Sequence, residues 1–274
     1  MWHIEPSARA SPTLSLARRV LTGARTLLAW DGLGPAQSVD VVVGRTQAFL
    51  NTTTARLGCT PNLSRTSGVW LMGASVCNGR VIVINLTGYL FLRRAGQTIT
   101  PTLEKAREPA LSRTWYLIAA RNMRGLAHEW THSARLTLAL RGATRGEPAW
   151  FREGLAETLS GLASVRGTKG RVSYLEYHVM NQRKFARWTS TCTLPVRRYR
   201  SSSSSLDGCE YFAGAAATAI LLADHGGLSR VLDLYRVAAE TNDWPTAFEA
   251  VYGMSPEYFE AKADRYIAGI RAVS

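Results

Sequence analysis

The sequence has no long hydrophobic run. Its longest apolar stretches, such as AGAAATAILLA at residues 213–223, are much shorter than the ~20 residues that a helix needs to cross a bilayer. Acidic residues are also few, with 20 aspartates and glutamates against 33 lysines and arginines. Because 46% of the residues are hydrophobic and 19% are charged, the composition is that of a globular chain. We therefore expect no transmembrane segment and a sizeable core.

The formal net charge of +13 is consistent with an anionic partner such as nucleic acid, acidic lipid or a cell-wall polymer. The arginines are scattered, however, and the densest spots, RNMR at 121–124 and VRRYR at 196–200, are short. No nucleic-acid-binding signature accompanies them. A basic surface without a specific nucleic-acid partner is therefore the favoured interpretation.

The four cysteines, at positions 59, 77, 192 and 209, form no C-x-x-C pair, which argues against a structural zinc site built from cysteines. Cys59 with Cys77, and Cys192 with Cys209, each enclose a short polar loop. We predict two local disulfides, with four independent buried thiols as the alternative. Disulfides are typical of an oxidising compartment. We therefore expect an extracytoplasmic or secreted location, although the first 30 residues show no clear signal peptide.

Turn signals and periodicity divide the chain into three parts. Residues 1–38 read as an N-terminal amphipathic helix or leader region, with the helix over 12–30. Residues 39–164 contain a β-branched strand at 39–44, a short helix after it, and a hairpin of 69–77 with 80–85 around Asn78–Gly79. A long helix within 112–140 and another at 149–164 complete this part. Residues 165–274 begin irregularly and then form three or four helices, and the three parts together are expected to make one compact catalytic unit.

The segment GLAHEWTHSARL, residues 125–136, places His128, Glu129 and His132 in the spacing H-E-x-x-H. Residues four apart on a helix share one face, so the two imidazoles can bind one zinc ion side by side. Glu129 can then reach a water on the metal as a general base. The alternative is a core helix that carries two histidines by chance.

A catalytic zinc needs a third protein ligand, and the predicted helix at 149–164 supplies one in WFREGLAE. Glu153 lies near its start, and the short preceding loop predicts that the two helices pack antiparallel. Glu157, one turn later, can accept the second N–H of His128 and fix its tautomer. Gly154 costs about 1 kcal/mol in a helix relative to alanine, which close approach of these two helices would explain. A solvated acidic face is the alternative, but its apolar neighbours argue against it.

The sequence His-Glu-Trp-Thr-His followed by Pro-Ala-Trp-Phe-Arg-Glu-Gly-Leu-Ala-Glu resembles the gluzincin metallopeptidases. These are the thermolysin-like and aminopeptidase-like families, often grouped as peptidase MA-like. The resemblance implies an α+β, zincin-like fold with a small N-terminal mixed sheet, a central HExxH helix and a C-terminal helical lobe. It also implies Zn²⁺ held by His128, His132 and Glu153, with Glu129 as the base. In these families a carboxylate one turn after the third ligand supports the first histidine, which matches Glu157.

Two further roles are implied by the resemblance. In the resembled fold a sheet lies above the active-site helix, and its edge strand pairs with an extended substrate. The strand at 80–85, with Val81 and Val83, is the best candidate, and an ordinary interior strand is the alternative. Such enzymes also place a tyrosine or histidine donor near the developing oxyanion. Tyr211, at the start of the first C-terminal helix, matches in order and approximate spacing.

We therefore expect a zinc-dependent peptidase that acts on a peptide or protein substrate through a metal-activated water. The G-x-M-E-N segment of the aminopeptidase-like family is absent, which slightly favours an endopeptidase. Two alternatives stay open. One is a catalytically silent binding protein that keeps the zincin fold, and the other is a basic binder of an envelope polymer or nucleic acid. The patterns leave the substrate and the oligomeric state open.

Overall fold

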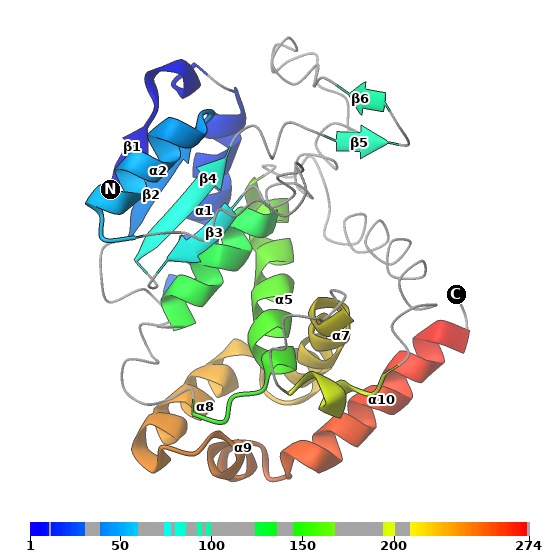
Figure 1. Cartoon of the computed structure of the whole chain (residues 1–274). Coiled ribbons are helices and arrows are strands. Elements are labelled where there is room, and N and C mark those ends of the chain that lie inside the picture. Colours follow the sequence, from blue (N-terminus) through cyan, green and yellow to red (C-terminus); the bar gives the residue numbers. More distant parts are fainter. Residues whose placement is uncertain are drawn as a thin grey trace. The chain divides into compact units, whose positions relative to one another are not determined.

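The computed structural model describes residues 1–10, 12–30, 39–59, 74–77, 80–85, 92–94, 97–99, 124–135, 145–167, 194–200 and 209–272 (Figure 1). They form a mixed α+β structure in which helices predominate, which confirms the predicted class. The chain forms two compact units. The sheet unit comprises Met1–Leu27, Pro35–Ala134 and Ser160–Tyr174, and the helical unit comprises Leu28–Gly34, Arg135–Leu159 and Leu175–Ser274. None of the described helices is long and apolar enough to cross a membrane.

A four-stranded mixed sheet lies in the sheet unit, in the order β1-β2-β4-β3. The strands β1 (Trp2–Ile4), β2 (Asp40–Gly44) and β4 (Val81–Asn85) run parallel, and β3 (Ala74–Cys77) pairs antiparallel with β4. The predicted pairing of β3 with β4 is thereby confirmed, whereas β1 was not predicted, because three residues are too few to show alternation. The strands β5 (Leu92–Arg94) and β6 (Gln97–Ile99) form a separate antiparallel pair.

The expectation that Val81 and Val83 lie on an edge strand is wrong. Strand β4 has partners on both sides, with Val83 opposite Val42 of β2 and opposite Ser75 of β3. The side chains from Val81 to Ile84 are all at most 3% exposed. A continuous apolar run of this kind is typical of a strand covered on both faces. Among the described strands of this sheet, β1 and β3 hold the outer positions.

Helices cover both faces of this sheet (Figure 1). On one face α2 (Gln47–Arg56) packs over a core cluster. The buried members of that cluster are Val42, Leu50, Cys59, Val81 and Val83. The alternate side chains on β2 and β4 are buried on the opposite face, where Figure 1 shows α1 (Pro12–Trp30). The predicted helix over 12–30 and the short helix after β2 are both confirmed.

A buried glutamate closes the junction between β2 and α2. The side chain of Glu5 accepts hydrogen bonds from the backbone N–H of Thr46 at 3.1 Å and from its hydroxyl at 2.7 Å, and also from the N–H of Arg45. Thr46 in turn caps α2. Burial alone would raise the pKa of Glu5, but the hydrogen bonds from Arg45 and Thr46 outweigh it and lower the pKa.

The helical unit contains the first part of α5 (Ala149–Gly167), then the short helix η4 (Val196–Tyr199) and four further helices. These four are α7 (Cys209–Asp224), α8 (Gly227–Thr241), α9 (Trp244–Tyr252) and α10 (Pro256–Ala272), as the periodicity predicts. Their core is aromatic. Trp150 stacks on Phe259 with 5.7 Å between ring centroids, and Trp244 contacts Phe248 at 4.9 Å. The indole N–H of Trp150 donates to Glu260 at 2.9 Å, which fastens α5 to α10.

Helices α5 and α7 cross in backbone contact at two glycines. A Cβ atom on Gly154 would lie 2.1 Å from the carbonyl oxygen of Gly214 and 2.5 Å from Oγ1 of Thr218. A Cβ atom on Gly214 would lie 2.2 Å from the carbonyl oxygen of Trp150. Gly154 does therefore mark a close approach of helices, as expected, but the partner at this contact is α7, because the matching glycine lies there.

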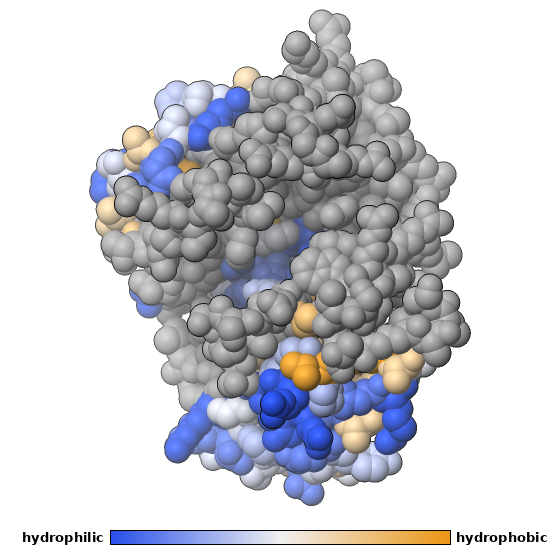
Figure 2. Space-filling model, turned by 45° about the vertical axis from the view of Figure 1, so that its right-hand side comes forward, coloured by the Kyte–Doolittle hydropathy of each residue, from blue (hydrophilic) through white to orange (hydrophobic). Residues whose placement is uncertain are grey.

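The described surface in Figure 2 is mostly hydrophilic, with hydrophobic colour in separate spots. Among the residues whose side chains the structure describes, the exposed large hydrophobic ones are Met1, Leu194, Tyr258 and Tyr266. Single exposed residues of this kind are normal for a protein surface and need no binding partner to explain them.

Some predictions fall outside the described residues. They include the Asn78–Gly79 turn, Cys192, the side chain of Cys77 and most of 165–208. Cys59 and Cys209, whose side chains are described, are both disulfide-bonded. Which cysteine each of them joins stays a prediction, and so do the expected location and the division of the chain at residues 38 and 164.

Candidate metal centre

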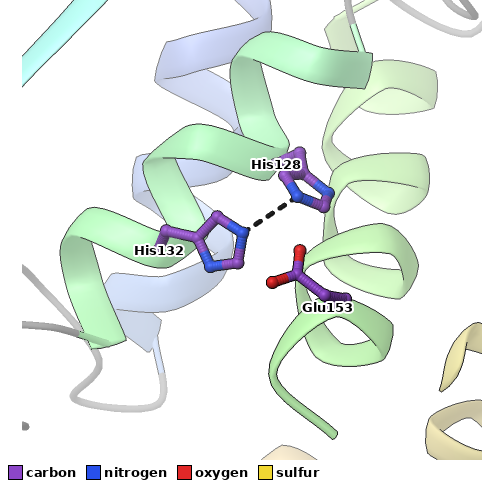
Figure 3. A group of neighbouring side chains, drawn as sticks. All are labelled: His128, His132 and Glu153. Atoms are coloured by element: carbon purple, nitrogen blue, oxygen red, sulfur yellow. Dashed lines mark hydrogen bonds between the residues drawn. The ribbon is translucent and has the colours of Figure 1, made fainter. Parts of the chain in front are cut away.

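The two predicted histidines and the predicted third ligand converge. His128 and His132 come from the HExxH helix (residues 124–135), and Glu153 comes from the second turn of α5. One ligand atom from each lies within 4.8 Å of the others. Figure 3 shows the carboxylate of Glu153 facing the two imidazole rings. These three side chains could hold a metal ion.

The two imidazoles are oriented by their spacing on the HExxH helix. Their Nε2 atoms lie 2.9 Å apart, and the rings meet edge to face with 4.6 Å between centroids. A tetrahedral site with bonds of about 2.0–2.1 Å separates ligand atoms by about 3.3 Å. Small side-chain movements would bring the three donor atoms to that spacing. Two imidazole nitrogens and one carboxylate oxygen therefore fit a metal site that keeps a further position open.

The first histidine lies in a buried part of the HExxH helix. His128 is 6% exposed, and its neighbours Leu126, Ala127 and Trp130 in the HExxH helix are buried. His132 and Glu153 are half-buried. Electrostatic interactions of a buried imidazole such as that of His128 are screened less by water than those of an exposed one.

The carboxylate of Glu153 has a cationic neighbour. The Nε–H of Arg152 donates to Oε1 of Glu153 at 2.9 Å, and their side chains are 24% and 12% exposed. This contact places a positive charge beside the carboxylate and so balances its negative charge.

The other predicted site residues lie on the same helices or on α7. Glu129 is half-buried beside His128, and Glu157 is half-buried one turn after Glu153. Tyr211 is half-buried in the first turn of α7, one turn before the glycine at which α7 crosses α5. The roles of Glu129 as base, Glu157 as support for His128 and Tyr211 as oxyanion donor stay predictions.

A buried polar group beside these helices was not predicted. Arg135, one turn after His132 in the HExxH helix, donates from Nη1 to Oε2 of Glu147, just before α5. The hydroxyl of Tyr235 on α8 donates to Oε1 of Glu147 at 2.6 Å. Burial raises the pKa of Glu147, while Arg135 and Tyr235 oppose that rise. The one signal in the sequence is a glutamate directly before Pro148, and nothing in the spacing identifies its partners.

The chain matches no protein-family model, and neither the curated proteins nor the solved structures include a significant match to it.

Proposed function

We propose that this protein is a zinc-dependent peptidase of the gluzincin type, with an endopeptidase slightly favoured. The observation that carries the proposal is the convergence of His128, His132 and Glu153. Zinc suits this donor set, since catalytic zinc sites combine histidines and a carboxylate with an open position. A bound zinc ion would polarise the substrate carbonyl and bring the pKa of a bound water near neutrality.

The chain's own residues would then move the protons. Glu129, the glutamate of the H-E-x-x-H segment, would accept a proton from the attacking water and pass it to the leaving amine. Glu157 would accept an N–H from His128 and so fix the tautomer that leaves Nε2 as the ligand atom. The hydroxyl of Tyr211 would donate a hydrogen bond to the oxyanion that develops on the substrate.

The mixed sheet supports a peptide substrate. Among the described strands, β3 pairs on one side only, with β4, and it runs antiparallel to the rest of the sheet. An extended peptide can add to such an edge through backbone hydrogen bonds, which need no particular side chain. We therefore place the substrate strand at β3 in this proposal, rather than at β4.

The proposal is tested with the zinc-loaded protein, an unfolded protein substrate and a peptide library. We expect the wild type to cleave peptide bonds and a chelator to stop it. We expect Glu129→Gln to bind zinc as tightly as the wild type and to cleave at least about a hundredfold more slowly. Glu249→Gln is the matched control, because Glu249 is exposed on α9, and it should cleave like the wild type.

Two results would contradict the peptidase proposal. Zinc binding without metal-dependent cleavage of any peptide would favour a silent binding protein. Salt-dependent retention on DNA or heparin that a chelator does not change, again without cleavage, would favour the basic binder.

A further inference from the structure

A buried ion pair joins the two segments that carry the candidate metal ligands. Arg135 follows His132 by three residues in the HExxH helix, and Glu147 precedes Glu153 by six residues. The side chains of Arg135 and Glu147 are 10% and 1% exposed. Tyr235 donates to the second carboxylate oxygen at 2.6 Å, so both oxygens of Glu147 have a donor. The pair is therefore buried, and both oxygens of its carboxylate accept a hydrogen bond.

Stability alone is a weak reason for such a pair. Removing two charges from water costs free energy, and well-packed apolar side chains of similar volume are often at least as stabilising. The pair instead restricts the relative position of the two side chains, because a guanidinium binds a carboxylate in a narrow range of distances and angles. A geometric constraint at this point acts on both ligand-bearing segments.

Only a few residues separate Arg135 from His132, and Glu147 from Glu153, so a restraint on the pair also restrains the ligands. His132 and Arg135 are separated by about 4.5 Å of helix rise, so fixing the guanidinium restrains the helical turn that carries the second histidine. Pro148 follows Glu147 directly. Proline has no backbone N–H and its φ is fixed near the helical value, so it restricts the backbone at the start of α5. Fixing the carboxylate of Glu147 therefore fixes the start of the helix that carries Glu153.

We propose that Arg135 and Glu147 are positioning residues of the metal site, which hold the HExxH helix and the start of α5 where their three ligands can share one ion. This inference rests on the proposed metal binding. Tyr235 lies on α8, which carries none of the three ligands, and it serves to hold Glu147 in place. Loss of its hydroxyl should therefore affect the site much less than loss of the pair.

The test uses Co²⁺ as the probe, because its visible absorption reports both binding and coordination geometry. The main variant is Arg135→Met with Glu147→Leu, which removes both charges at similar volume and leaves no lone buried charge. Tyr235→Phe tests the role assigned to α8. Val231→Ala is the control for general loss of stability, since Val231 is fully buried on α8. Circular dichroism of the metal-free proteins first establishes which variants are folded.

We expect the folded double variant to bind Co²⁺ about 10- to 100-fold more weakly than the wild type, as when other residues that orient metal ligands are lost. Its absorption band should also change shape. Tyr235→Phe and Val231→Ala should both keep the wild-type band. A double variant that is folded and binds Co²⁺ with the wild-type affinity and spectrum would overturn the inference, because the pair would then be structural only.

The remaining outcomes are also decisive. If the double variant does not fold, Glu147→Gln replaces it, since this change keeps the volume and removes the charge. Weaker Co²⁺ binding by folded Glu147→Gln supports the positioning role, and unchanged binding overturns it. If the wild type itself binds neither Co²⁺ nor Zn²⁺, the proposed function fails and this inference falls with it. If the wild type binds metal and the variants do so equally, the inference alone fails.

Discussion

Replacing Gly154 by alanine tests the crossing of α5 and α7 directly. The added Cβ would lie 2.1 Å from the carbonyl oxygen and 2.2 Å from the carbonyl carbon of Gly214. Both neighbours are backbone atoms, so no flexible side chain can move aside. The two helices would have to separate by about 1 Å or more to restore ordinary contact.

Two opposing terms set the size of the effect. Alanine is about 1 kcal/mol better than glycine inside a helix, which by itself would stabilise the variant. Overpacking of a well-packed core typically costs 1–3 kcal/mol and sometimes more, and a clash between two backbones belongs at the upper end. We expect Gly154→Ala to lower the free energy of unfolding by about 2 kcal/mol net. Because Glu153 is the adjacent residue, metal affinity should fall as well.

The assay is urea unfolding followed by circular dichroism, with Gly269→Ala as the matched control. Gly269 is also helical, in α10, and a Cβ atom there would meet nothing within 4 Å. The control should therefore gain up to about 1 kcal/mol from helix propensity alone. If Gly154→Ala is as stable as the wild type, or gains as much as Gly269→Ala, then the backbone contact between α5 and α7 is absent.

Three further predictions follow from other contacts. Trp150→Phe removes the N–H that donates to the buried carboxylate of Glu260, so urea unfolding should show a loss of about 1.5–3 kcal/mol; no loss would mean that this hydrogen bond is not made. The folded pKa of Glu5 lies below its ordinary value of 4.5, so the unfolded chain binds more protons between the two values and stability rises with pH there. The stability advantage of the wild type over Glu5→Gln should accordingly be full at neutral pH and vanish as the pH falls through the folded pKa; an advantage that persists in acid would refute this account. Zinc at a hundredfold excess over its Kd should raise the free energy of unfolding by about 2.7 kcal/mol, an effect that His132→Ala should abolish in a thermal shift assay.

Helices and strands with a clear period were predictable from the sequence. The four C-terminal helices and α5 each repeat their apolar residues at helical spacing, and the pairing of β3 with β4 follows from two apolar runs around Asn78–Gly79. The three candidate ligands were predictable as well, because metal ligation ties residue type to spacing on a helix. These features depend on residues that are close together in the sequence, so the sequence alone is enough to predict them.

What the sequence did not predict depends on partners far along the chain. The position of β4 inside the sheet is set by β2 and β3 together, and a single apolar run does not show how many neighbours it has. The partner of Gly154 at the crossing is Gly214, 60 residues later. Arg135 and Glu147 are 12 residues apart in the sequence, and no local pattern shows that their side chains meet. Such pairings arise from tertiary packing, which cannot be predicted from the local periodicity of apolar residues.

The measurement that tests the central claim most directly is zinc binding by the wild type and by Glu153→Ala, followed by X-ray absorption at the zinc edge. The account predicts one zinc ion per chain, with two imidazole nitrogens and one carboxylate oxygen at about 2.0–2.2 Å. It predicts that Glu153→Ala loses the carboxylate oxygen from the zinc shell and most of the affinity. A wild type that binds no zinc, or a Glu153→Ala variant with the wild-type affinity and shell, would contradict it.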